Sequence, residues 1–286
     1  MNAQFWLIQS FNGISYGALL FLLASGLTLI FGVMRIVNLS HGAYFLLGGY
    51  IALSVIWTTG SWVLAVPVAA LVVAVVGLVM ERVFLRPLGF DPLRQVLLTV
   101  GFAFLFQQAA LDIWGGNNLD ITPPEMLRGS TVVGELHLPV YRIFMIGMAV
   151  VLGAILWLVM EKTRAGAMIR AAVDDSEMAR GVGIDTSRVS MFIFALGAFL
   201  AALAGVIGGG FLGIYPGLDF EILPVAFAVV IIGGMGSLTG AAVGSLIVGL
   251  ADNFGKALFP EVSYFTLYAP MVLILAVKPT GLFGRE

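Results

Sequence analysis

The stretch WLIQSFNGISYGALLFLLASGLTLIFGV, residues 6–33, contains no charged side chain. Mostly apolar runs of about 17–25 residues are long enough to cross the hydrocarbon core of a bilayer as one α-helix. Residues 6–33 therefore predict a transmembrane helix. No Lys or Arg precedes Arg35, so the basic segment with which a cleavable signal peptide begins is not evident.

The composition extends this interpretation to all 286 residues. Sixty per cent of them are apolar and only 10% are charged, and the mean hydropathy is +1.06. Soluble domains have about 25% charged residues, so lipid must solvate most of this apolar surface. The apolar runs are continuous, whereas a β-barrel alternates in segments of about ten residues. We expect an all-α, polytopic transmembrane bundle of about eight or nine spans, forming a single domain over residues 1–286.

Apolar runs place nine helices along the chain. The predicted spans cover residues 6–33, 42–58, 62–82, 95–114, 140–160, 190–213, 222–233, 239–256 and 263–280. The run at 222–233 is too short to cross a core of about 30 Å at about 1.5 Å per residue. It is either a half-helix or a helix in a thinned, protein-lined environment. Eight spans remain an alternative, with 222–256 as a re-entrant hairpin.

Basic residues set the predicted orientation, because cytoplasmic loops of membrane proteins are enriched in Lys and Arg. With the N-terminus outside, loops 34–41, 83–94 and 161–189 and the C-terminus lie in the cytoplasm. Of the 14 Lys and Arg residues, 11 then lie inside and three outside. The inside set is Arg35, Arg82, Arg86, Arg94, Lys162, Arg164, Arg170, Arg180, Arg188, Lys278 and Arg285, and the outside set is Arg128, Arg142 and Lys256.

Glycine is abundant and regularly spaced in the sixth span. Small residues recur there at every fourth position, namely Gly197, Ala201, Gly205, Gly209 and Gly213. Small residues at this spacing let helix backbones approach closely in a membrane. The stripe is either a packing seam or a seam along which helices slide during transport.

Two segments resemble one another weakly: GVMRIVNLSHGAYFLLGGYIAL, residues 32–53, and GGMGSLTGAAVGSLIVGL, residues 233–250. Each reads as a break on the cytoplasmic side followed by a glycine-rich helix. Internal repeats and interrupted helices are common in transporters, where a break exposes backbone groups that line a pathway. We therefore expect interrupted helices, although the similarity is too low to establish a duplication.

The motifs of catalysis and cofactor binding are missing from the sequence. Gly255 and Lys256 precede Ala257 rather than Ser or Thr, so no phosphate-binding loop for ATP is present. The two histidines, His41 and His137, fall on opposite sides of the predicted membrane, which excludes a paired-histidine metal site. Cysteine is absent, and a net charge of -2 gives no indication of a nucleic-acid partner. We expect no enzyme activity, and no metal or cofactor bound by this chain.

The largest predicted cytoplasmic loop, 161–189, is unusually polar and carries ten of the 30 charged residues. Within it, DDSEMARGVG reads as a short helix capped by Asp175 or Ser176 and ended by Gly181 and Gly183. The stretch 165–173 before it is rich in alanine and favours a helix. This helix–helix platform is either a docking surface for a cytosolic partner or a solvated loop.

Four blocks of sequence carry a family resemblance. They are GLTLIFGVMRIVNLSHG, RAAVDDSEMARGVGIDTSRV, IIGGMGSLTGAAVGSLIVGL and VKPTGLFGR, in this order from residue 26 to residue 285. All four resemble the permeases of high-affinity branched-chain amino acid ABC transporters, the LivH/LivM group. The N-x-x-H-G block at Asn38, His41 and Gly42, together with the length, is more similar to the LivH side.

The resemblance implies one permease subunit of a bacterial ATP-driven importer, spanning the inner membrane several times. Its expected partners are a second, LivM-like permease, two cytosolic ATP-binding cassette subunits that use the ATP, and a periplasmic solute-binding protein. The polar loop would then be the coupling helix that enters an ATPase cleft. The candidate coupling residues are Arg170, Asp175, Ser176, Glu177, Met178, Arg180 and Val182. The E-A-A-x3-G motif of importers in general is not reproduced, because Arg170 precedes the Ala171–Ala172 pair and Gly181 lies too far away.

Further candidates are polar or glycine residues at breaks and within spans. For the translocation path they are Asn38, Ser40, His41, Gln107, Gln108, Gly233, Gly234 and Gly236. The first three could instead satisfy backbone groups freed by a break, and the glycines could serve turns and packing. Asp219 and Glu221 are candidates for docking the binding protein, or ordinary acids of an outer loop.

The resemblance leaves the substrate open, because the family also includes permeases for urea, short amides and aromatic acids. Branched-chain amino acids are the first choice. A hypothesis from a different class is a self-sufficient secondary transporter or channel, in which buried ionisable residues mark an ion path. Few charges lie deep in the predicted spans, which disfavours it.

Overall fold

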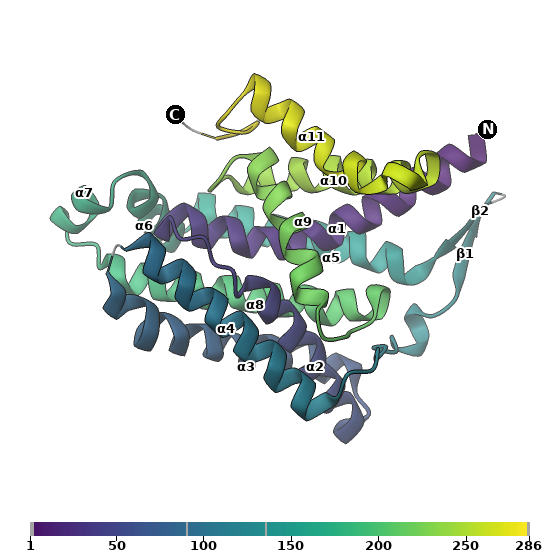
Figure 1. Cartoon of the computed structure of the whole chain (residues 1–286), viewed down its shortest axis with the longest axis horizontal. Coiled ribbons are helices and arrows are strands. Elements are labelled where there is room, and N and C mark those ends of the chain that lie inside the picture. Colours follow the sequence, from purple (N-terminus) through teal and green to yellow (C-terminus); the bar gives the residue numbers. More distant parts are fainter. Residues whose placement is uncertain (1–2, 90, 135, 285–286) are drawn as a thin grey trace.

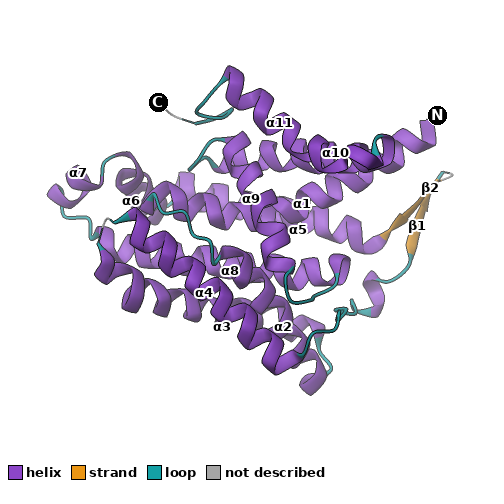
Figure 2. Cartoon of the chain, in the orientation of Figure 1, coloured by secondary structure: helices purple, strands orange, loops and turns teal. Residues whose placement is uncertain are grey.

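The structure is a computed structural model, and it describes residues 3–89, 91–134 and 136–284 (Figure 1). Most of this chain is helical (Figure 2). In chain order the elements are α1 (Ala3–Met34), α2 (His41–Thr59), α3 (Trp62–Val79), the π-helix η1 (Met80–Leu85), the 3-10 helix η2 (Arg86–Leu88), α4 (Pro92–Trp114), the 3-10 helix η3 (Glu125–Leu127), β1 (Ser130–Val133), β2 (Leu136–Pro139), α5 (Val140–Lys162), α6 (Arg164–Asp174), α7 (Ser176–Gly181), α8 (Thr186–Leu212), α9 (Leu218–Gly233), α10 (Leu238–Leu258), the 3-10 helix η4 (Pro260–Val262) and α11 (Ser263–Val277).

Each predicted span falls on a helix. Within the described residues, eight helical stretches are long and apolar enough to cross a membrane. The helix α9 is not one of them, since its 16 residues measure about 24 Å at about 1.5 Å per residue. The predicted short seventh helix is therefore confirmed. The third span is longer than predicted, because α3 continues through η1 and η2 to Leu88.

Four of the long helices begin directly after a short polar side chain that caps them. Ser61, Asp91, Asp185 and Ser237 each accept a hydrogen bond from the backbone N–H three residues further on. Such caps satisfy one of the four amide groups that a helix leaves free at its start. These caps set the starts of α3, α4, α8 and α10.

Two helices begin inside the bundle rather than at its surface. The chain runs without regular structure from residue 35 to residue 40, and α2 then starts with His41 and Gly42 fully buried. The chain is again irregular between Gly213 and Gly217, and α9 starts with Leu218 and Asp219 buried. A Cβ atom on Gly42 would collide with the backbone oxygen of Asp219. The first turns of α2 and α9 therefore meet in the interior.

The packing of α1–α4 is repeated by α8–α11. The helix α1 packs on α10 as α8 packs on α3, while α2 contacts α3 and α4 as α9 contacts α10 and α11. Leu19 of α1 lies by Gly208 of α8, and Gly26 lies by Gly197, so the two helices run antiparallel (Figure 1). This is the arrangement of an inverted repeat. It relates the break after α1 to the break after α8, and not to the turn at 233–237 that the sequence suggested.

The glycine stripe of α8 is a packing seam within the chain. A Cβ atom on Gly197 would meet Ile30 of α1, and one on Gly205 would meet the backbone of Phe45 in α2. Gly209 lies against Ile214 in the same way. Close packing against small residues of this kind, to backbone at Gly205 and to isoleucine side chains at Gly197 and Gly209, holds helices together in lipid.

A β-hairpin stands out from the bundle and was not predicted. The strands β1 and β2 pair antiparallel from Ser130 to Pro139. They lie at the end of the bundle where α1 begins, whereas α6 and α7 lie at the opposite end (Figures 1 and 2). Below, these are called the hairpin end and the α7 end. Among the predicted inside residues, Arg285 lies outside the described part of the chain.

Candidate functional site

The helix α6 is folded back firmly on the end of α5. The hydroxyl of Thr163 caps it by accepting a hydrogen bond from the Gly166 N–H at 3.1 Å. Gly166 has no room for a side chain, because a Cβ atom there would collide with the carbonyl groups of Val159 and Met160. Ile169 on the next turn is buried. A displacement of α6 therefore has to move α5 with it.

The short helix α7 is capped as the sequence predicted. One carboxylate oxygen of Asp175 accepts hydrogen bonds from the N–H groups of Glu177 and Met178, each at 2.9 Å. The helix ends before Gly183, which has a positive φ of 89°. Ala179 is buried and holds α7 to its neighbours. The predicted helix–helix platform is thus confirmed as structure, while its role as a coupling element stays a prediction.

Two apolar side chains of the platform face away from the bundle. Met178 is 66% exposed and Val182 is 70% exposed. Beside them the Arg180 Nε donates to the backbone oxygen of Ser176 at 3.1 Å, which pins the guanidinium along α7. An anchored helix that exposes large apolar side chains amid charged ones has the character of an interface core.

Arg170 lies apart from the other candidate coupling residues. It is on α6, 3.9 Å from the carboxylate of Glu161, and one of its guanidinium nitrogens is buried without a hydrogen bond. It lines a cavity of about 820 Å³ together with residues of the 233–239 turn and of the C-terminal segment. The structure therefore brings Asp175, Ser176, Glu177, Met178, Arg180 and Val182 together and leaves Arg170 on another surface.

The candidate path residues near the first break lie in the interior and bind one another. The Oδ1 of Asn38 accepts hydrogen bonds from the Ser40 hydroxyl at 2.7 Å and the Ser40 N–H at 3.1 Å. His41 Nε2 lies 3.0 Å from the carbonyl oxygen of Leu23, and the Leu39 N–H donates to Thr99 at 3.2 Å. Two of these bonds, those from the N–H groups of Leu39 and Ser40, satisfy backbone groups that the irregular segment 35–40 leaves free. The geometry accounts for the structural interpretation and leaves a path role as a prediction.

The other candidate path residues lie at different places. Gln107 is half-buried and Gln108 exposed on the later half of α4, where Gln108 donates to Asp112 at 2.9 Å. Gly233 is the last residue of α9, before the turn to α10, and its carbonyl accepts from the Phe283 N–H of the C-terminal segment at 2.9 Å. At Gly234, in the turn that follows, a side chain would collide with the backbone of the C-terminal segment. Gly236 touches the backbone of Gly32 at the end of α1. These residues do not form one site with Asn38, Ser40 and His41.

The two acids proposed to dock a binding protein differ in exposure. Glu221 is exposed and accepts a hydrogen bond from the Tyr215 hydroxyl at 2.8 Å. Burial, reinforced by the hydrogen bond and charge of Glu221, raises the pKa of Tyr215 to about 12, so the phenol stays a neutral donor.

For Asp219, the structure corrects the prediction that it is a docking residue or an ordinary acid of an outer loop. It is only 2% exposed, so it is neither an ordinary loop acid nor a residue that a docked protein can reach. Its carboxylate lies near the amide groups of the first turn of α9 but makes no well-formed hydrogen bond with the described residues. Its burial follows from the contact between the first turns of α2 and α9.

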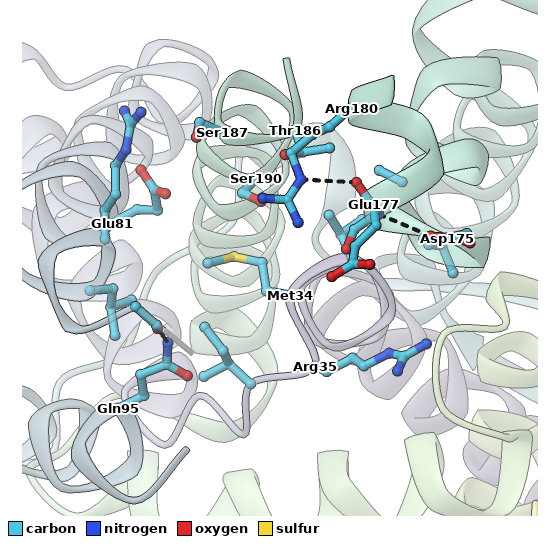
Figure 3. Close-up of a pocket in the computed structure, with 18 of the residues that line it drawn as sticks. Met34, Arg35, Glu81, Gln95, Asp175, Glu177, Arg180, Thr186, Ser187 and Ser190 are labelled. Atoms are coloured by element: carbon cyan, nitrogen blue, oxygen red, sulfur yellow. Dashed lines mark hydrogen bonds between the residues drawn. The ribbon is translucent and has the colours of Figure 1, made fainter. Parts of the chain in front are cut away.

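A cavity of about 770 Å³ opens beside α7 and was not predicted. It lies between α7, the end of α1, η1, the start of α4 and the start of α8 (Figure 3). We call it the α7 cavity. On the wall opposite Glu177 lies Glu81, which is 2% exposed, and its Oε2 has no hydrogen-bond partner. The sequence held a signal for it, because Glu81 is an acid inside the predicted span 62–82, and ionisable residues in spans tend to be functional.

Comparison with known proteins covers nearly the whole chain. The family model "Branched-chain amino acid transport system / permease component" matches residues 9–275. The high-affinity branched-chain amino acid transport system permease protein LivH of Escherichia coli K12 is 32% identical over 100% of this chain and 98% of its own length. The corresponding permease protein BraD of Pseudomonas aeruginosa is 30% identical over 98% of this chain and 96% of its own.

A more distant relative is found in sugar transport. The ribose import permease protein RbsC of Haemophilus influenzae is 28% identical over 46% of this chain and 43% of its own length. No solved structure matches the chain. The family match and the full-length identities agree with an all-α fold whose helices are long enough to span a membrane. The chain belongs to the family of permease components of branched-chain amino acid transport systems.

Proposed function

We propose that this chain is one of two permease subunits of an ATP-driven importer in the bacterial cytoplasmic membrane. The substrates are branched-chain amino acids, and the chain forms half of their path. The support is that relatives named for this transport align with the chain along its full length. ATP is bound and hydrolysed by partner subunits, and the chain itself carries out no chemical reaction.

The observation that carries the proposal is an exposed apolar pair, Met178 in α7 and Val182 directly after it. Both side chains are mostly exposed, on a segment that α6 anchors to the bundle. Fully burying a side chain such as methionine or valine contributes about 1.5–3 kcal/mol. Burial of this pair in an ATPase cleft would hold the two proteins together. Gly166 packs tightly against the end of α5, so α6 cannot shift relative to α5. A movement of the ATPase that displaces α7 and α6 would therefore also displace α5 and the bundle.

The remaining partners are assigned to the two ends of the bundle. The α7 end, where α6 and α7 with their basic residues lie, faces the cytosolic ATPases. The hairpin end faces the periplasm, where the solute-binding protein delivers the amino acid. Glu221, which is exposed, remains a candidate contact for that protein.

Purification and uptake together test the proposal. The chain should be expressed together with the proposed second permease and the proposed ATPases. After extraction in mild detergent, it should co-purify with two ATPases and the second permease. Reconstituted with the binding protein and ATP, the complex should take up leucine, isoleucine or valine.

Each contrary result has its own meaning. Uptake of urea, a short amide or an aromatic acid in place of leucine would change the substrate and keep the mechanism. Uptake by the chain alone, without ATPases, would refute the importer and favour a secondary transporter.

A further inference from the structure

The α7 cavity is large enough for a small ligand. Its volume of about 770 Å³ falls in the range of about 300–1,000 Å³ that ligand pockets occupy. One wall is α7 itself, with Asp175, Glu177 and Arg180 (Figure 3). The opposite wall is η1, where Glu81 lies (Figure 3). The cavity therefore separates the proposed docking helix from a buried acid.

Glu81 is the group in this cavity that most needs a ligand. Its side chain is buried, and Oε2 makes no hydrogen bond. Burying a carboxylate without a partner is costly, so buried charges are normally paired. Glu81 also lies in a π-helix, a conformation that is rare and frequently occurs at functional sites. These observations point to a cationic partner that enters the cavity.

The charges of Arg82 and Arg86 act on Glu81 from nearby, but within the described residues neither arginine forms a salt bridge with it. Arg35, Arg86 and Arg180 line the same cavity. Within the described part of the chain, none of them forms a salt bridge, whether to Glu81 or to another acid. Arg35 is also held in a left-handed conformation, with φ 53°, which non-glycine residues seldom adopt. The cavity thus offers one buried carboxylate and nearby guanidinium groups at the same time.

A group that matches both is the zwitterionic head of an α-amino acid. Its ammonium can donate to the Glu81 carboxylate, and its carboxylate can pair with a guanidinium, of which Arg35 and Arg86 line the cavity. A divalent metal fits less well, because the described residues contain no cluster of three acidic or histidine ligands. The apolar part of the ligand has Val33, Ile36 and Leu85 beside it.

The cavity also adjoins the first helix break. Ile36 lines the cavity and precedes Asn38 and Ser40, and Met80, next to Glu81, lies 3.6 Å from the Ser40 hydroxyl. An amino acid leaving the interior near the break would therefore find the cavity next to it.

We infer that the α7 cavity is a binding site for a free amino acid at the α7 end of the permease, with Glu81 accepting hydrogen bonds from its ammonium group. The choice of a branched-chain amino acid as ligand rests on the proposed function. The role of Glu81 toward an ammonium group rests only on the cavity and its charges.

The test uses the purified transport complex without binding protein. Titration calorimetry measures the affinity for L-leucine, for isopentylamine, which lacks the carboxylate, and for 4-methyl-2-oxopentanoate, which lacks the ammonium. We expect leucine to bind most tightly, isopentylamine more weakly, and the oxo acid at least tenfold more weakly than leucine. Glu81→Gln should weaken leucine binding at least tenfold, and Glu81→Asp should restore part of it.

The control is Glu125→Gln, the same change at an exposed acid in η3, which should leave leucine binding unchanged. The thermal unfolding of each variant complex shows that it is folded. The inference fails if wild type binds neither leucine nor isopentylamine, if the oxo acid binds as tightly as leucine, or if Glu81→Gln binds leucine within twofold of wild type.

The proposed function is judged separately, by uptake. Import of leucine with unaltered binding in Glu81→Gln overturns the inference and keeps the importer. If ammonium compounds bind in a way that depends on Glu81 but the wild type does not take up leucine, the inference is kept and the proposed importer function is overturned.

Discussion

Gly205 shows most directly that α8 and α2 are packed backbone to backbone. In Gly205→Ala the added Cβ atom would collide with the carbonyl group of Phe45 and lie 3.2 Å from the Gly49 nitrogen. Overpacking of this kind costs about 1–3 kcal/mol, and the upper end applies because backbone atoms cannot rotate away. Alanine returns about 1 kcal/mol through its better helix propensity. The net loss of stability is about 2 kcal/mol.

The matched control is Gly147→Ala in α5, where a Cβ atom would meet nothing within 4 Å. There only the helix propensity changes, so the variant should gain up to about 1 kcal/mol. Thermal unfolding in detergent measures both. At about 2–4 °C per kcal/mol, Gly205→Ala should lower Tm by about 4–8 °C, whereas Gly147→Ala should not lower it. A Tm of Gly205→Ala equal to or above that of Gly147→Ala would refute the packing of α8 on α2.

Two further predictions concern orientation and the α7 platform. With single cysteines in this cysteine-free chain, an impermeant thiol reagent should label Ser130→Cys only from outside intact cells and Ser176→Cys only in inverted vesicles; the reverse pattern would overturn the orientation. Asp175→Ala removes the cap that binds two amide groups of α7 and should cost about 0.5–2 kcal/mol of local stability. It should lower the yield of co-purified ATPase, while Asp175→Asn, which can still cap, should lower it much less. Equal yields for the two variants would show that the cap does not matter for docking.

Local sequence patterns predicted the features that depend on one segment alone. The length of each apolar run gave nine helices, including the short α9. Capping and stop residues gave α7, because Asp175 bonds amides only two and three residues away. The breaks at 35–40 and 234–237 were predicted from their polar and glycine residues for the same reason.

Features that depend on distant segments were not predicted. Asp219 reads as a loop acid because the residues beside it do not reveal that Gly42, far away in sequence, packs over it. The α7 cavity likewise requires α1, η1, α4, α7 and α8 to be placed together. The weak similarity between residues 32–53 and 233–250, too low to establish a duplication, does not correspond to the repeat seen in the packing. Similar glycine spacing serves a turn after Gly233 and a buried break at 35–40, and only the packing distinguishes the two.

The hairpin was missed because its strands are short. Each has four residues, which is too few for an alternating pattern to stand out among loop residues. The hairpin extends from the bundle (Figure 2), and even in β2, where half-buried and exposed residues alternate, no residue is fully buried.

The central claim, that α7 couples an ATPase to the bundle, is tested most directly by Met178→Asp. The control is Met126→Asp, the same change at an 82% exposed methionine near the hairpin. ATP hydrolysis and leucine uptake are measured together in vesicles that contain the complex and its binding protein. A charge against an apolar cleft should reduce ATPase retention or the uptake per ATP hydrolysed at least tenfold, because the lost burial and the added desolvation exceed about 1.4 kcal/mol. Met126→Asp should behave as wild type; full, coupled activity of Met178→Asp would contradict the account.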